Sequence, residues 1–223
     1  FNNAGIDILG GGRSLTPYRD NVLLNLSTCF LIISGGIGFL VMVDVVKCRF
    51  RFRKFTLHSK VVVTTTAFLL AAGTLLLKFT DPLSWLTAFF LSVSARTAGF
   101  ATLDLGTLSN AGLFTILILM FIGASPGSTG GGIKVSRILI LLKSSLADMR
   151  KMLHPNAVTT VRLEGKPLTE KNIRGAHVFI SVYLVVFVAS FLLLSLEQFD
   201  LVTTFTALAA CICLLYTSPS PRD

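Results

Sequence analysis

The sequence predicts an all-α integral membrane protein, built from repeated units of helix, pore loop and helix. Hydrophobic residues make up 52% of the chain and charged residues only 14%, against about 25% charged residues in a typical soluble domain. Basic residues gather in two stretches between apolar segments, 47–60 and 134–174, which is the positive-inside pattern of cytoplasmic loops. Several apolar segments are shorter than the roughly 20 residues that cross a bilayer. The net charge of +9 therefore indicates orientation in a membrane, and we expect no nucleic-acid partner.

The first elements alternate between apolar spans and charged ends. Residues 1–20 are polar and glycine-rich, and we expect a first span at 22–46, with small residues at 34–38 that allow close helix packing. Six basic and no acidic residues follow in 47–60, which we place in the cytoplasm. A second span at 61–77 then returns the chain to the outside.

The next segment, 81–134, has the pattern of a pore hairpin. Asp81 and Pro82 are expected to cap a short apolar half-helix at 83–93, and a polar turn follows at 94–106. An inner helix at 108–123 comes next. Non-helical backbone at membrane depth is tolerated only when it is buried in protein or lines a watery cavity. Carbonyls exposed there can replace the hydration shell of a cation.

The second half of the chain repeats this order. The pattern of residues 133–152 predicts an amphipathic, basic helix that continues into the cytoplasm. Residues 153–177 are polar, and we expect them to form an exposed intracellular connection. A span at 178–196 and a second short apolar segment at 201–212 follow.

An internal repeat supports this division. Asn3-Ala4-Gly5-Ile6 matches Thr97-Ala98-Gly99-Phe100 at a spacing of 94 residues. We therefore divide the chain into the end of one pore repeat (1–60), a complete repeat (61–152), a cytoplasmic linker (153–177), the start of a further repeat (178–213) and a tail (214–223).

The turn around Gly99 is the candidate ion site. Glycine adopts positive φ freely, so it can aim its carbonyl at an axis, although a lone glycine is equally typical of an ordinary turn. We expect Arg96 to point behind the turn, toward a carboxylate or backbone carbonyls, because a guanidinium in the path would repel cations. Asp7, Asp81 and Asp104 are expected on the outer side, where they would concentrate cations.

The stretch GASPGSTGGGIK, residues 123–134, interrupts the inner helix. It differs from a phosphate-binding P-loop, because Ile133 separates Gly132 from Lys134 and no hydroxyl residue follows the lysine. Glycine costs about 1 kcal/mol relative to alanine in a helix, so we predict an unwound loop that acts as a gate. Lys134 would mark its cytoplasmic edge or pair with a carboxylate. The gate residues are Ser125, Gly127, Ser128, Thr129, Gly130, Gly131, Gly132 and Lys134.

Catalytic and metal-ligating patterns are not evident. We find no arrangement of Ser, His and Asp or of paired carboxylates, and the four cysteines show neither zinc nor disulfide spacing. We therefore expect a protein that is not an enzyme.

Together these motifs resemble the Trk/Ktr/HKT superfamily of potassium-uptake proteins, most closely the bacterial Trk-type membrane subunit. The residues that carry the resemblance are FNNAG at 1–5, SARTAGF at 94–100, the glycine-rich stretch 120–134 and HPNAV at 154–158. The resemblance implies four repeats around one K⁺ path, as in a K⁺-channel-like pore, with K⁺ at Asn3, Ala4, Thr97 and Ala98. The implied filter residues are Asn3, Ala4, Gly5, Arg96, Thr97, Ala98, Gly99 and Phe100.

The resemblance also implies a setting and partners. It places the chain as a multi-pass protein in the bacterial cytoplasmic membrane, as a homodimer with cytosolic nucleotide-binding regulatory subunits. K⁺ is the cargo, and no cofactor is expected in this chain. Relative to the family pattern, the first repeat, half of the second and the fourth filter are missing. Residues 214–223 resemble translated sequencing-adapter sequence, so we interpret them as a non-native tail.

Two other functions stay open at this point. A secondary transporter would bind an anionic substrate at the N-termini of broken helices, and inverted repeats would identify it. A membrane protein that only mediates interactions would have no use for paired pore turns.

Overall fold

The computed structural model describes residues 2–3, 5, 14–49, 51–154, 162–163, 166–168, 170–197 and 200–213. This part is almost entirely helical, as predicted, and one small pair of strands lies in the chain between the sixth and seventh helices. The helices are α1 (Val22–Ile37), α2 (Phe39–Lys47), α3 (Leu57–Thr80), α4 (Trp85–Ser94), α5 (Asn110–Phe121), α6 (Val135–Leu153), α7 (Glu170–Ser195) and α8 (Leu201–Cys213). Short 3-10 turns lie at Thr16–Tyr18, Phe52–Lys54 and Leu105–Thr107, and strands β1 (Arg162–Leu163) and β2 (Lys166–Pro167) pair antiparallel.

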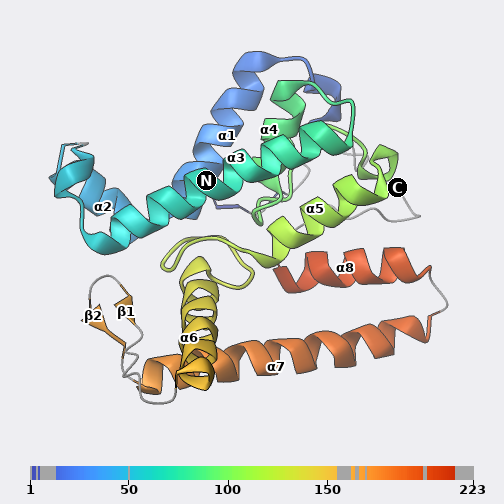
Figure 1. Cartoon of the computed structure of the whole chain (residues 1–223). Coiled ribbons are helices and arrows are strands. Elements are labelled where there is room, and N and C mark those ends of the chain that lie inside the picture. Colours follow the sequence, from blue (N-terminus) through green and yellow to red (C-terminus); the bar gives the residue numbers. More distant parts are fainter. Residues whose placement is uncertain are drawn as a thin grey trace.

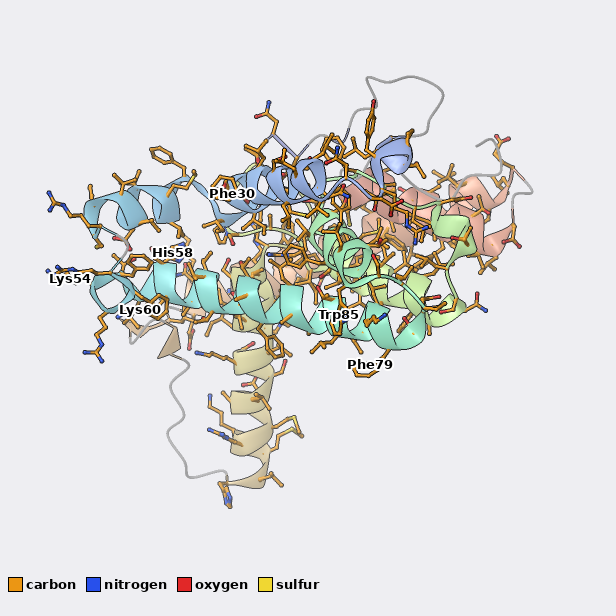
Figure 2. All side chains as sticks on the ribbon, turned by 90° about the horizontal axis from the view of Figure 1, so that it is seen from above. Phe30, Lys54, His58, Lys60, Phe79 and Trp85 are labelled. Carbon is orange, nitrogen blue, oxygen red and sulfur yellow. The ribbon has the colours of Figure 1, made fainter. Side chains whose placement is uncertain are left out.

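Helices α3 and α7 are the two described helices that are long and apolar enough to cross a membrane individually. They run in the same direction, each starting at the end of the molecule that carries α2 and the β1–β2 pair (Figure 1). Figure 2 shows Lys54 and Lys60 at that end of α3, and Phe79 with Trp85 at the other. The basic stretch 47–60 thus lies at one end of α3, as the positive-inside pattern predicts, and Lys78 is in the last turn at the other end. The common direction of α3 and α7 favours parallel over inverted repeats.

The first predicted span is not one straight helix. α1 and α2 are joined at Gly38, and their axes differ by 99°. Gly38 has φ +97°, a conformation that side chains other than hydrogen disfavour. The predicted span at 22–46 is therefore two helices joined by a sharp bend, because an apolar run that contains glycines is compatible with either a straight or a broken helix.

Other boundaries also differ from those expected. Ser84, rather than Asp81 and Pro82, caps α4, and its Oγ accepts a hydrogen bond from the Thr87 N–H at 3.1 Å. α3 begins at Leu57 and extends to Thr80, beyond the predicted 61–77. α7 begins at Glu170, so the last part of the predicted 153–177 connection is helical.

The short helix α4 is buried over most of its length, from Thr87 to Ser94, and exposed at Trp85. It packs between α1 and α3 on one side, where Phe90 and Val93 contact Cys29, Ile32 and Leu70. On its other side it joins a second cluster with residues from α5, α7 and α8. Gly73 of α3 admits this close approach, since a Cβ there would lie 2.5 Å from Ser92 Oγ of α4. The core therefore fixes the position of the turn that follows α4.

Candidate ion-binding turns and glycine-rich loop

The two turns matched by the repeat share an unusual backbone. Asn3 and Gly5 have φ of +52° and +56°, and Thr97 and Gly99 have +68° and +83°. A residue other than glycine in this region costs of order 1–3 kcal/mol and persists only where its surroundings enforce it. The positive φ predicted for Gly99 is confirmed, and the same two positions of each turn are left-handed. Ala4 lies outside the described residues.

The two turns are in contact. A Cβ at Gly5 would collide with the Ala98 carbonyl oxygen and lie 2.8 Å from the Gly99 Cα. Thr97 and Ala98 are fully buried. The turn around Gly99 is fixed on its far side by Ser94, whose hydroxyl donates to the Phe100 carbonyl, and by Ala101, whose N–H donates to Ser14 Oγ at 3.1 Å. Segments far apart in the sequence thus form one compact backbone cluster.

Arg96 reaches a backbone carbonyl, one of the two kinds of partner predicted for it. Its guanidinium is buried and donates to the carbonyl of Gly123 at 3.4 Å. Arg96 follows the C-terminal end of α4, and Gly123 follows that of α5. Helix C-termini carry partial negative charge, which stabilises a buried cation at this place.

The glycine-rich loop between α5 and α6 is unwound, as predicted, and closed at its base. The N–H of Gly123 donates to the Ile133 carbonyl, and the N–H of Ile133 donates to the Phe121 carbonyl, both at 3.1 Å. Lys134 Nζ donates to the Gly130 carbonyl. This partner is a carbonyl of the loop itself, not the carboxylate that was one of the two alternatives for Lys134.

The loop lies directly against both turns. The Gly131 N–H donates to Thr97 Oγ1 at 3.0 Å. A Cβ at Gly130 would lie 2.7 Å from that oxygen and 3.5 Å from Asn3 Nδ2. The predicted filter and gate residues are therefore brought together at one place, with Asn3, Thr97 and Gly130 at their junction.

The tip of the loop contacts the break between α1 and α2. The N–H groups of Ser125 and Thr129 donate to the carbonyls of Gly36 and Gly35, at 3.2 and 3.4 Å. Ser128 Oγ donates to the Ser125 carbonyl at 2.6 Å. A phosphate cradle needs its N–H groups free for the ligand, but several of these are already bonded within the protein. The sequence did not predict the contact with Gly35 and Gly36, although their small size was a signal that something approaches closely.

The acidic residues expected at the outer surface are divided. Asp81 is buried, and its carboxylate accepts from the N–H and Oγ of Ser109 at 2.8 and 3.1 Å. It therefore joins the end of α3 to the start of α5, and the expectation that it concentrates cations was wrong. Asp104 is exposed and accepts from the Gly106 N–H at 2.9 Å. Asp7 lies outside the described residues.

Comparison with known proteins shows the family. The model of a family described as TrkH, cation transport protein, matches residues 60–213. The chain belongs to this family. The chain is thus a multi-pass membrane protein of the Trk type, as its motifs and apolar helices predict.

Curated relatives carry uptake functions in their names. The chain is 41% identical over 155 residues to the potassium/sodium uptake protein NtpJ of Enterococcus hirae, an alignment that covers 64% of the chain and 33% of the relative. It is 38% identical over 163 residues to the Ktr system potassium uptake protein B of Bacillus subtilis, covering 67% of the chain and 36% of the relative. The chain thus spans about a third of the length of these relatives, which are transport proteins rather than enzymes.

A solved structure extends the likeness to the whole chain. The crystal structure of the potassium transporter TrkH from Vibrio parahaemolyticus matches with a TM-score of 0.85 at 25% identity, over 99% of this chain and 48% of that one. The predicted fold class is confirmed, and the chain spans about half of that transporter.

Proposed function

We propose that the protein containing this chain takes up K⁺ across the bacterial cytoplasmic membrane. Carbonyls at Asn3, Ala4, Thr97 and Ala98 bind the ion, in place of its hydration shell. Gly5, Arg96, Gly99 and Phe100 shape and support the turns. The names of the relatives, potassium uptake and potassium/sodium uptake proteins, support a monovalent cation as the cargo.

One observation carries the proposal. Two turns from different repeats, with left-handed backbone at matching positions, touch each other and rest on one unwound loop. Left-handed positions are strained for Asn3 and Thr97, and such strain is typical of functional sites. In this proposal the two turns form two of the four walls of a carbonyl-lined filter. The unwound loop beneath them forms the gate.

Helix direction supports a cation rather than the anionic substrate of a secondary transporter. α4 runs into the turn with its C-terminal end, at Ser94, which carries partial negative charge. An anion site needs half-helix N-termini there, and inverted repeats. The common direction of α3 and α7 in Figure 1 is that of parallel repeats.

The proposed assembly includes partners and no cofactor in this chain. The protein forms a homodimer in the lipid bilayer, and a cytosolic nucleotide-binding subunit docks on the basic face. That face comprises residues 47–60 and the exposed basic residues of α6. K⁺ is transported and not retained as a cofactor.

The experiment is ion flux into vesicles that contain the full-length protein. We expect uptake of K⁺ or Rb⁺ down an imposed gradient, and its loss when Thr97 is replaced by Pro, which cannot adopt φ +68°. Thr107→Pro, in an exposed outer turn, is the matched control. An uptake rate that is unchanged in the Thr97→Pro protein, or uptake that requires an organic anion, would contradict the proposal.

A further inference from the structure

The break between α1 and α2 and the tip of the glycine-rich loop supply each other's backbone partners. In a continuous α-helix, each carbonyl accepts from the N–H four residues later, so Gly35 would pair with Phe39. Here the Gly35 carbonyl accepts from the N–H and Oγ1 of Thr129, both at 3.4 Å. The Phe39 N–H donates instead to the Gly127 carbonyl at 3.1 Å. The loop therefore provides the hydrogen-bond partners of both the Gly35 carbonyl and the Phe39 N–H, which would pair with each other in a straight helix.

The neighbouring positions show the same exchange. The Gly36 carbonyl, which would accept from Leu40 in a straight helix, accepts from the Ser125 N–H at 3.2 Å. Gly38 allows the loop to approach, because a Cβ there would lie 2.9 Å from the Pro126 carbonyl oxygen. Buried backbone groups must be paired at membrane depth, so the bend is stable only while the loop is docked on it.

We propose that the loop and the Gly38 break form a two-state latch. With the loop docked, α1 and α2 are held at 99°. With the loop withdrawn, Gly35 pairs with Phe39 and the two helices straighten into a single span. Residues 22–47 would then be about 39 Å long at about 1.5 Å per residue, enough to cross the hydrocarbon core.

The exchange explains how the two states can be close in free energy. The helix groups at Gly35, Gly36 and Phe39 are paired in both states, because helical hydrogen bonds replace those that the loop gives up. The freed groups of the loop, at Ser125, Gly127 and Thr129, can be satisfied by water in the opened path. Gly38 must adopt φ +97° in the docked state and ordinary helical angles in the other, which glycine does at little cost. Such near-balanced elements are those that ligands or subunits switch.

The consequence for transport rests on the proposed function. If the loop closes the ion path, α1 and α2 straighten when the path opens. The conformation of the inner helix of one repeat is then coupled to the position of the gate loop of the next. The structural part, that loop docking holds the bend, stands independently of what crosses the pore.

Distance measurement tests the structural part directly. Spin labels at Leu26→Cys and Val46→Cys, both exposed positions, would be placed in the full-length protein with its other cysteines replaced. From the rise per residue and the 99° angle, we expect about 20 Å between the labelled backbone positions when bent and about 30 Å when straight. Deletion of residues 130–132 should shift the distribution toward the longer distance.

Point variants keep the test independent of the deletion. Gly38→Ala should favour the longer distance, because alanine disfavours φ +97° and meets Pro126. Thr129→Val removes the hydroxyl bond to Gly35 without changing the shape of the side chain, and should raise the long-distance population a few-fold even if Gly38→Ala does not fold. Gly175→Ala is the matched control, since a Cβ there meets nothing within 4 Å.

The outcomes separate the two proposals. A distance that stays near the bent value in both the deletion and the Thr129→Val protein would overturn the latch. A shift to the longer distance with no rise in K⁺ flux would leave the latch standing and contradict the gate role in the proposed function.

Discussion

Gly99 is the residue at which a side chain is expected to disturb ion selection most. Its φ is +83°, and its Cα lies close to the position that a Cβ at Gly5 would occupy. In the full-length protein, Gly99→Ser should weaken discrimination of K⁺ over Na⁺ by roughly tenfold or more, because the turn can no longer aim its carbonyls. Uptake of both ions in a K⁺-uptake-deficient strain measures this. Gly175→Ser is the control, and unchanged selectivity in Gly99→Ser would remove Gly99 from the filter.

Asp81 is expected to matter for stability rather than for ion attraction. Its buried carboxylate accepts two hydrogen bonds from Ser109, and loss of such a partner leaves buried donors unsatisfied at about 1–3 kcal/mol. Asp81→Ala should therefore lower the melting temperature in detergent by several degrees. Asp104→Ala, at an exposed turn, should change it little. A larger effect of Asp104→Ala would refute this assignment.

At the scale of elements, the loop between α5 and α6 is expected to act as the gate. It is unwound, closed at its base and in contact with Thr97, so its removal should free the path. The turns should keep their shape, because the turn at Gly5 also packs against Ala98 and Gly99. Deletion of residues 130–132 should raise K⁺ flux several-fold and reduce its dependence on the cytosolic subunit, with selectivity intact.

The competing role for this loop is nucleotide binding. It predicts that the same deletion abolishes ATP binding and leaves basal flux unchanged. Flux and ATP-binding assays with and without the partner distinguish the two roles. Equal or lower flux, with partner dependence unchanged, would end the gate hypothesis.

At the scale of the whole molecule, charge predicts orientation. The end that carries Lys54 and Lys60 (Figure 2) should face the cytoplasm, and the turn at Thr107 the outside. In a protein without native cysteines, a membrane-impermeant thiol reagent applied to intact cells should label Thr107→Cys and spare Lys54→Cys, both exposed positions. The reverse pattern would overturn the topology.

The extent of the chain predicts its activity in isolation. It covers 48% of the solved relative, so it lacks part of the pore wall that four repeats would provide. Residues 1–223, purified and reconstituted alone, should give no K⁺ flux above that of empty vesicles, whereas the full-length protein should. Selective flux from residues 1–223 would show that the assignment of repeats is wrong.

Local signals determined much of this protein from sequence alone. The lengths of the apolar runs separated spans from the half-helices α4 and α8, since hydrocarbon thickness sets a minimum length. Glycine-rich composition predicted the break after α5, because it disfavours helix locally. The match of residues 3–5 with 97–99 predicted two equivalent turns, and their backbone angles agree.

Only the tertiary structure decided how groups distant in sequence pair. The bend at Gly38 depends on carbonyl and N–H partners in residues 125–129. The small residues around Gly38 signal a close approach, but they do not identify these partners. Asp81 is buried where Ser109 lies opposite it, and Arg96 donates to the Gly123 carbonyl rather than to a carboxylate. An apolar run or a lone charge leaves several conformations open, and the choice follows from which buried backbone groups find partners when the elements pack.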